Sequence, residues 1–340
     1  MLTSITRYFK DPFGRKMRSR KSLEGVGFEA EDRKYPFTIS SWDDYHSYRP
    51  TLPPSMFAAW IKYHQDHGGK LDVAHDIGAG KSNPRSGTGA AFLSQVFAHT
   101  YVSDPGEANI AAARARLQPA DKFTFNQSPA EVQWPGPSSV DMAVICNALH
   151  WTDAPVVMAN LAATLKPGGS FACCMQAFRI NFPQSPRLDE LWLAATEAVM
   201  SKLHRDGHLS DAIKAGIRHS YSGYEGVDVP AEHFADVRRW QVNVREGDAT
   251  PYRFTKPGEF EENPRRVKDS ETEEYVEDPG WQRQVDVEWL RGFLRTTTLP
   301  LGDDIWALPP WLELERVIKN EFGGQVTAEW PVYMLLATRK

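Results

Sequence analysis

Cysteine is scarce in this 340-residue chain, which contains only Cys146, Cys173 and Cys174. None of the three has metal-ligand spacing, and an odd number of cysteines without a secretory signal is not the pattern of a disulfide-rich extracellular domain. The adjacent pair is expected to point to opposite faces of one strand. The sequence therefore predicts reduced, buried thiols, no metal site and a cytoplasmic protein.

Long apolar runs and excess positive charge are lacking too. No run approaches the roughly 20 apolar residues that span a bilayer, and the net charge of −5 leaves no overall basic field for nucleic acid. The basic segment over residues 1–35 predicts a flexible arm. The alternative, a mitochondrial presequence, is weakened by Asp11, Pro12 and Gly14, which interrupt an amphipathic helix. We expect a monomer or homodimer that acts on a small molecule and binds neither nucleic acid nor a membrane.

Short apolar runs typical of strands alternate with helix-like segments through the first half of the chain. Strands are expected over residues 70–77, 100–104, 122–127, 139–149 and 170–178, and helices over 87–98, 106–117 and 154–169. This alternation is typical of an α/β domain with a mostly parallel sheet.

The pattern changes after residue 178. Amphipathic helices are expected over 186–207, 209–218, 286–296 and 310–322, with a candidate strand over 237–244 and a solvated loop over 256–280. The chain closes with a long strand over 326–340, in which Pro331 implies an edge position or a bulge. We interpret residues 36–178 as the core, 179–310 as a mainly helical insertion or cap, and 311–340 as the return to the sheet.

The first expected strand runs into a glycine loop, "HDIGAGKS". A phosphate-binding P-loop would need a glycine at the position of His75, so that interpretation fails. A dinucleotide fingerprint would need a third glycine at Asn83, which weakens it. A third pattern, an acid at the end of the strand followed at once by G-x-G, is satisfied by Asp76, Gly78 and Gly80.

Further motifs follow in order: "VSDP", "SPAE", "NALHWTD" and "LKPGGSF", with "WDDYHSYRPTLP" upstream. Together with "HDIGAG" they resemble class I S-adenosylmethionine-dependent methyltransferases, and more narrowly the branch with trans-aconitate methyltransferases and many fungal secondary-metabolite enzymes. The resemblance implies a Rossmann-like fold with a mostly parallel seven-stranded sheet, an antiparallel C-terminal strand and a helical cap. It implies S-adenosylmethionine as cofactor. The chain departs from the family by the inserted "KSNPRSGTG", so either the loop bulges after Gly80 or Gly87 and Gly89 share the contact.

The resemblance also assigns site residues. Those expected to contact the cofactor are Tyr45, Arg49, Asp76, Gly78, Ala79, Gly80, Asp104, Pro105, Ser128, Ala130, Glu131 and Asn147. Asp104 is expected to accept hydrogen bonds from the ribose hydroxyls, and the alternative is a helix cap. Glu131 is expected near the adenine, with a solvated first-turn acid as the alternative. Asn147 is expected near the methionine portion.

A second group of residues is expected around the acceptor: Tyr48, His150, Trp151, Arg179 and Trp289. His150 is a candidate general base, with a structural histidine as the alternative. Arg49 can pair with a carboxylate of cofactor or substrate. The insertion also contains Trp192, Trp240, Trp281, Trp306 and Trp311, which suit a flat acceptor pocket, although the sequence does not say which of them face inward.

Methyl transfer relies mainly on in-line alignment and exclusion of water. An ionised carboxylate acceptor needs no base, whereas a phenol or thiol benefits from one. We predict a small-molecule methyltransferase that methylates an oxygen atom, in a carboxylate or hydroxyl of a secondary metabolite. The alternatives are S- or N-methylation, a methyltransferase-fold protein that catalyses a non-methylating rearrangement, and a nicotinamide-dependent oxidoreductase.

Overall fold

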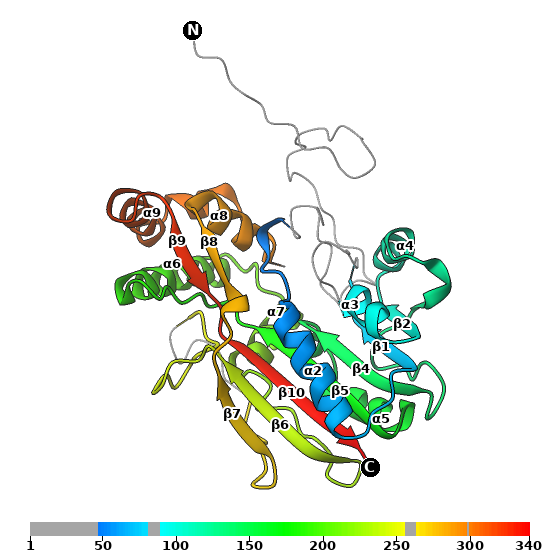
Figure 1. Cartoon of the computed structure of the whole chain (residues 1–340). Coiled ribbons are helices and arrows are strands. Elements are labelled where there is room, and N and C mark those ends of the chain that lie inside the picture. The colour runs from blue at the N-terminus through cyan, green and yellow to red at the C-terminus, as the bar shows by residue number, and fades with distance from the viewer. Residues whose placement is uncertain (1–46, 81–88, 256–262, 298) are drawn as a thin grey trace.

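The computed structural model describes residues 47–80, 89–255, 263–297 and 299–340. Its main sheet has eight strands in the order β3-β2-β1-β4-β5-β10-β6-β7 (Figure 1). These strands are β1 (Val73–Ile77), β2 (His99–Asp104), β3 (Phe123–Gln127), β4 (Val140–Cys146), β5 (Leu165–Gln176), β6 (Phe234–Val242), β7 (Thr272–Val276) and β10 (Val332–Arg339).

The first five strands run parallel, because each connection crosses over through a helix or a long loop. Strand β10 is inserted antiparallel between β5 and β6, and β7 pairs parallel with β6. The expected α/β class, Rossmann-like topology and antiparallel C-terminal strand are confirmed. The sheet has eight strands rather than the seven expected.

Helices cover both faces of this sheet. On one face lie α2 (Pro54–Asp66), α3 (Gly89–Val96) and α4 (Glu107–Arg116), and on the other lies α5 (Ala154–Thr164). The two cysteines of β5 lie on opposite faces of the sheet. Cys174 belongs to the same hydrophobic cluster as Trp60 of α2, and Cys173 belongs to the cluster of Met158 of α5. The expectation that the adjacent pair faces opposite ways is confirmed, and all three cysteines are free thiols.

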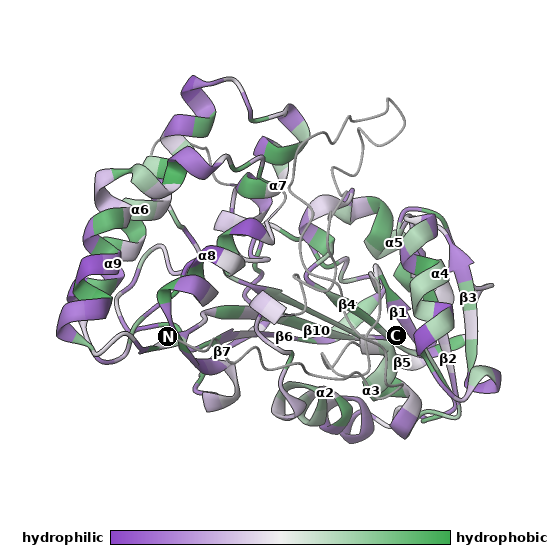
Figure 2. Cartoon of the chain, turned by 90° about the horizontal axis from the view of Figure 1, so that it is seen from above, coloured by the Kyte–Doolittle hydropathy of each residue, from purple (hydrophilic) through white to green (hydrophobic). Residues whose placement is uncertain are grey.

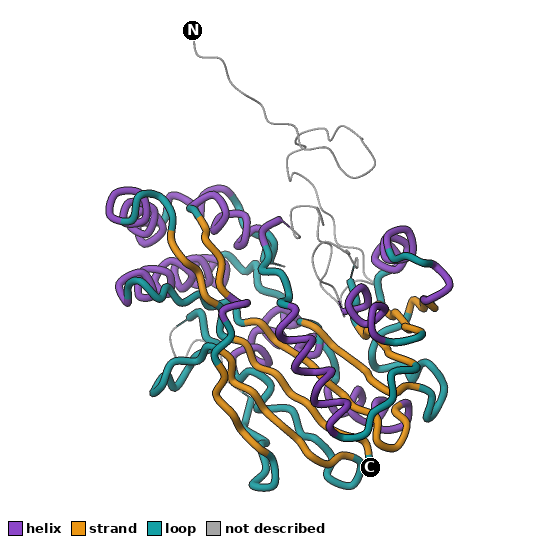
Figure 3. Tube along the Cα trace, in the orientation of Figure 1, coloured by secondary structure: helices purple, strands orange, loops and turns teal. Residues whose placement is uncertain are grey.

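Between β5 and β10 the chain forms α6 (Pro186–Arg205), α7 (Asp211–Tyr221), α8 (Val287–Arg295) and α9 (Pro309–Glu321). A small second sheet pairs β8 (Gln282–Val285) with β9 (Val326–Glu329). Figure 2 shows hydrophobic and hydrophilic residues alternating along α6 and α9, as they do in amphipathic helices. The tube in Figure 3 shows this helical part beside the main sheet, with β8 and β9 between the helices and the sheet.

Three sequence expectations need correction. Residues 272–276 of the expected solvated loop form the edge strand β7, which was missed because exposed Glu273 and half-buried Glu274 interrupt any apolar alternation. Residues 256–262 of that loop lie outside the described residues. The helix expected to reach 169 ends at Thr164, and the following residues begin β5. The single final strand is two strands, β9 and β10, which separate at Pro331 and join different sheets.

The insertion is also less purely helical than expected, because β6 and β7 extend the main sheet. One hydrophobic cluster runs through both parts and includes Trp60 of α2, Val144 of β4, Trp192 of α6 and Phe293 of α8. The boundary near residue 178 stays a prediction, and the continuous cluster shows that core and insertion share buried surface. None of the described helices has both the length and the apolar composition required to cross a bilayer.

Candidate functional site

The glycine turn after β1 is pressed against two neighbouring segments. Gly78 and Gly80 have φ of +69° and +59°, the left-handed region that glycine adopts without strain. The N–H groups of Gly78 and Ala79 donate to Ser103 O of β2 at 2.9 and 3.1 Å. A Cβ on Gly78 would lie 2.7 Å from the Cβ of Ala148, which follows β4. The turn therefore requires a backbone without a side chain, as a close-fitting ligand also does.

Asp104 ends β2 beside this turn. Its Oδ2 accepts a hydrogen bond from Gly80 N at 2.9 Å, while its Oδ1 accepts from Gly106 N and Asn109 Nδ2, each at 2.8 Å. The Oδ1 contacts lie at the start of α4 and are those of the helix-cap alternative. Oδ2 lies at the glycine turn, which is where the cofactor-binding prediction requires it. The helix-cap interpretation thus applies to Oδ1, and the cofactor-binding prediction concerns Oδ2.

Asp76 and Asp104 form a pair of buried acids. Asp76 is 2% exposed, and its Oδ2 accepts from Ala90 N at 2.6 Å, at the start of α3. Burial raises the pKa of Asp76 to about 7, assisted by the negative charge of Asp104 and opposed by the Ala90 N–H. Burial likewise raises the pKa of Asp104. Among the described residues these two carboxylates accept hydrogen bonds from backbone and amide N–H groups, and a cationic ligand would offset the desolvation of their charged forms.

The loop after β3 lies next to Asp104. Ser128 N donates to Asp104 O at 3.0 Å, and Gln127 Nε2 donates to Pro105 O at 3.2 Å. Ala130 O accepts from Asn160 Nδ2 of α5 at 3.1 Å, and Glu131 Oε1 accepts from Asp153 N at 3.1 Å. The structure thus places Pro105 and Ser128 next to Asp104, and Ala130 and Glu131 against α5 and its N-cap, while contact of these four residues with the cofactor remains a prediction.

Asn147 joins the ends of β4 and β5. Its φ of +52° is a conformation that asparagine tolerates better than most residues. Its N–H donates to Cys174 O at 2.9 Å, and its Oδ1 accepts from Gln176 N at 2.7 Å. This turn directs the chain into the short helix η3 (Leu149–Trp151), which carries His150 at the carboxyl edge of the sheet.

Helix α7 covers η3. A Cβ on Gly216 of α7 would come closer than 3.0 Å to three carbons of the Trp151 ring, so the ring lies against the helix backbone. His219 Nδ1 donates to His150 O at 2.9 Å, and Tyr224 Oη lies 3.5 Å from His150 Nδ1. The sequence analysis did not identify Gly216, His219 or Tyr224, because nothing local marks residues that meet η3 from about 70 positions away.

His150 lines this region with part of its ring surface accessible. Burial lowers the pKa of its imidazole to about 3, and the nearby positive charges of His219 and Arg49 lower it further. The ring is therefore neutral near pH 7 and is a weak base. It can accept or donate a hydrogen bond to a bound molecule, and its predicted role as general base requires a pKa far from this value.

Residues 47–49 lie against α8. Arg49 Nε donates to Thr296 Oγ1 at 2.9 Å, and its Nη2 donates to Thr296 O at 3.2 Å. The positive charge of Arg49 also lowers the pKa of His150, which follows β4. Tyr48 is half-buried against the same helix, and Tyr45 lies outside the described residues.

Two residues expected at the acceptor have structural partners. Arg179 forms an ion pair with Asp248 at 2.9 Å and donates to Thr250 O at 2.9 Å, so its guanidinium is already paired. Trp289 is 8% exposed, and its Nε1 donates to Ser47 O at 3.1 Å. The expectation of a tryptophan-lined pocket is narrowed, because Trp192, Trp281 and Trp311 are fully buried in the core, and Trp240 and Trp306 are half-buried.

The glycine turn, Asp104 and Asn147 lie at the carboxyl ends of β1, β2 and β4, where open α/β sheets bind their ligands. A glycine turn after β1, an acid at the end of β2 and an antiparallel strand inserted beside β5 define a Rossmann-like methyltransferase fold of class I. Within the described residues no cluster of three or more histidine, cysteine or acidic side chains is placed to hold a metal ion.

Comparisons with known proteins agree with this methyltransferase fold. Residues 75–173 match the family model for the methyltransferase domain. Methyltransferase AacuQ of Aspergillus aculeatus is 27% identical over 315 residues, which cover 92% of this chain and 97% of that protein. Methyltransferase tpcM of Aspergillus fumigatus is 29% identical over 318 residues, covering 92% and 95%. The structure of a type II methyltransferase candidate from Anaeromyxobacter dehalogenans superposes with a TM-score of 0.51 at 19% identity, covering 85% of this chain and 97% of that one.

The chain therefore contains a methyltransferase domain on a Rossmann-like methyltransferase fold, is similar to fungal methyltransferases, and has S-adenosylmethionine as its cofactor. The narrower trans-aconitate branch is not singled out by these matches. The residues present fit the cofactor on physical grounds. Glycines with positive φ at 78 and 80 leave the backbone free of side chains at these two positions of the turn. Asp76 and Asp104 are buried acids whose charged forms burial disfavours, and the cofactor carries a sulfonium, an ammonium and two ribose hydroxyl donors that would offset this cost.

Proposed function

We propose that this protein transfers a methyl group to an oxygen of a small secondary-metabolite acceptor that reacts as an anion, either a carboxylate or an ionised hydroxyl. The observation that carries the proposal is the position of Arg49, whose guanidinium α8 holds through Thr296 and the Phe293 ring and whose positive charge lowers the pKa of His150. A positive guanidinium favours an anionic acceptor. A neutral imidazole with a pKa of about 3 offers little help in deprotonating a phenol.

The chain's own residues would divide the work as follows. The Gly78–Gly80 turn and Asp104 hold the adenosine portion, and Asn147 orients the end of β4. Bound S-adenosylmethionine supplies a methyl group activated by positive sulfur. The acceptor oxygen forms the new C–O bond as the C–S bond breaks, and the electron pair of that bond stays on sulfur as a neutral thioether. Helix α7 and residues 47–49 exclude water from the edge where the two meet.

The test is a methyl-transfer assay on the full chain with a panel of carboxylates, phenols, amines and thiols, read by mass spectrometry. We expect transfer to oxygen, and products methylated on nitrogen or sulfur would contradict the proposal.

The pH–rate profile of the preferred acceptor then tests His150. We expect kcat for His150→Ala to stay within about threefold of wild type with an unchanged profile, because a base of such low pKa contributes little. His208→Ala, an exposed histidine between α6 and α7, is the matched control. A profile that loses one limb only in His150→Ala would restore the general-base role.

A further inference from the structure

Helix α8 holds the start of the described chain along one side. Trp289 Nε1 donates to Ser47 O, and Thr296 at the end of the helix accepts both hydrogen bonds from Arg49. The Arg49 guanidinium also lies over the Phe293 ring, 5.0 Å from its centroid. Figure 1 shows this first described segment, in dark blue, beside α8. Residues 47–49 are thus attached to three successive turns of one helix.

Gly292 lies at the centre of this contact. A Cβ at this position would come closer than 3.0 Å, a separation that real Cβ atoms essentially never show, to three carbons of the Tyr48 ring. The φ of Gly292 is that of an ordinary helix, so the backbone conformation does not require glycine. A glycine inside a helix costs about 1 kcal/mol relative to alanine. The close approach of the Tyr48 ring is therefore the local feature that requires glycine here.

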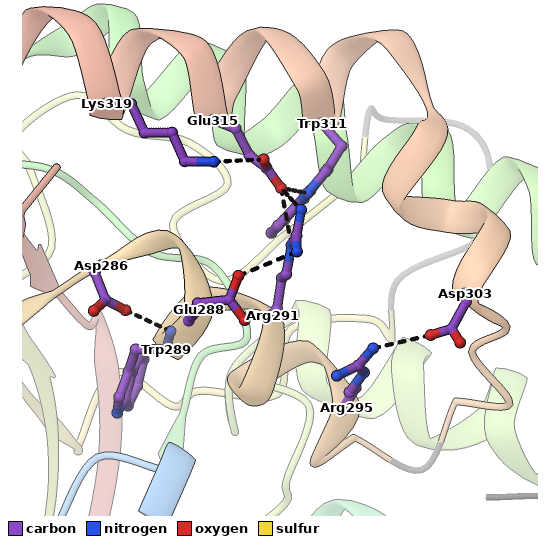
Figure 4. A network of polar contacts seen from close by, with 9 residues as sticks. All are labelled: Asp286, Glu288, Trp289, Arg291, Arg295, Asp303, Trp311, Glu315 and Lys319. Carbon is purple, nitrogen blue, oxygen red and sulfur yellow. Dashed lines mark hydrogen bonds and ion pairs between the residues drawn. The ribbon is translucent and has the colours of Figure 1, made fainter. Parts of the chain in front are cut away.

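The opposite side of α8 is anchored to α9. Arg291 Nε donates to Glu315 Oε1 at 2.9 Å, and Trp311 Nε1 donates to the same oxygen (Figure 4). Lys319 forms an ion pair with Glu315 at 3.3 Å, and Glu315 is 7% exposed. Rotating α8 away from Tyr48 would break the contact of Arg291 with Glu315, so we expect a clash at Gly292 to move Tyr48 rather than the helix.

We propose that Gly292 is a positioning residue for methyl transfer, because it lets Tyr48 dock on α8 and so keeps Arg49 on Thr296 and the Phe293 ring. The inference rests on the proposed function, which places Tyr48 and Arg49 at the acceptor. Gly292 itself touches neither cofactor nor acceptor. Its side-chain-free surface acts through Tyr48.

The test compares Gly292→Ala with Gly136→Ala, an exposed glycine whose added Cβ would meet open space. In Gly292→Ala we expect kcat/KM for the acceptor to fall about tenfold or more, since displacing positioning groups by an ångström is that costly. The melting temperature should not fall, because alanine favours the helix. Amide hydrogen exchange at Ser47, Tyr48 and Arg49 should accelerate. Gly136→Ala should show none of these changes.

A double-mutant cycle with Tyr48→Ala completes the test. If Gly292→Ala acts through the Tyr48 ring, its effect in the Tyr48→Ala background should shrink to less than about twofold. Equal effects in both backgrounds, or unchanged exchange at residues 47–49, would overturn the proposal. A wild-type protein that methylates no acceptor would instead refute the proposed function, and the exchange comparison would still report whether Gly292 docks Tyr48.

Discussion

At the scale of single residues, the site depends on acids that are buried without a positive partner among the described residues. Asp76 and Asp104 are held by the N–H groups of Ala90, Gly80 and Gly106. Burial raises the free energy of each charged carboxylate by desolvation, and a cationic ligand with hydroxyl donors can offset this cost. Substitutions at these two positions should therefore separate ligand binding from folding.

Asp104→Asn should weaken S-adenosylmethionine binding by about 1–3 kcal/mol, as expected when hydrogen bonds to a charged acceptor are lost. The amide oxygen can still accept from Gly106 and Asn109, whereas the amide NH2 can accept neither from Gly80 N–H nor from a ribose hydroxyl, so some loss of thermal stability should accompany the loss of affinity. Isothermal titration calorimetry measures the loss. Asn109→Ala, which touches only Oδ1, is the control, and an equal loss of affinity there would reduce Asp104 to a helix cap.

Asp76→Asn should stabilise the ligand-free protein at and above neutral pH. The native pKa of about 7 exceeds the ordinary value of 3.8, so between these values the native state keeps a proton that the unfolded state has lost. The stability contributed by protonated Asp76 is thus complete below about pH 4 and is lost as the pH rises through 7. The neutral variant avoids this loss, on the order of 2–4 kcal/mol.

Urea unfolding of wild type and Asp76→Asn at several pH values measures the difference. We expect the advantage of Asp76→Asn to grow from about pH 4 to 7 and then to level off. An advantage for wild type at alkaline pH would mean that the carboxylate is stabilised by its surroundings. The variant should also bind the cofactor more weakly, because the site loses a negative charge.

At the scale of elements, the site is roofed by helices from the insertion. Helix α7 packs on η3 through Gly216 and Trp151, and α8 holds residues 47–49. Each roof element contacts a segment that is distant in sequence. The α8–α9 contact through Glu315 supports the helix that holds residues 47–49.

Glu315→Gln should lower the free energy of unfolding by about 1–3 kcal/mol, because it removes the charged acceptor of Arg291 and Lys319 from a buried position. Glu313→Gln on the same helix is the matched control. Glu313 is partly exposed and pairs with Arg187 and Arg316, so its loss should cost less than that of Glu315, because surface ion pairs contribute little. Chemical denaturation compares the two, and equal losses would show that Glu315 does not anchor α8.

At the scale of the whole molecule, one hydrophobic cluster joins the sheet, α2, α6, α8 and α9. The cofactor site uses the ends of several strands of this same body. Binding at the site should therefore stabilise the molecule as a unit.

S-adenosylmethionine or its demethylated product should raise the melting temperature. At a ligand concentration of a hundred times the dissociation constant, binding adds about 2.7 kcal/mol to the free energy of unfolding. NAD at the same concentration should not raise the melting temperature, since Asn83 replaces the third glycine of the dinucleotide pattern. Differential scanning fluorimetry with both ligands decides. Asp104→Asn should show a reduced shift, and a shift with NAD alone would contradict the assignment of the site.

Local patterns in the sequence determined the alternating strands and helices, the glycine turn after β1 and the acids at the ends of β1 and β2. These features depend on neighbours a few positions apart, so side-chain period and turn chemistry are sufficient to predict them. Where that local signal is weak the prediction failed, as for β7, whose exposed edge carries two glutamates.

Only the tertiary structure decided which side chains are free to serve the site. Arg179 is paired with Asp248, Trp289 binds Ser47, and His219 reaches the carbonyl of His150. The tertiary structure also shows that the Tyr48 ring packs directly on Gly292, which explains a glycine inside α8. The partners in these contacts come from chain segments up to 244 residues apart, as from Tyr48 to Gly292. No short-range pattern encodes such contacts, because they form only when packing of the whole core brings the segments together.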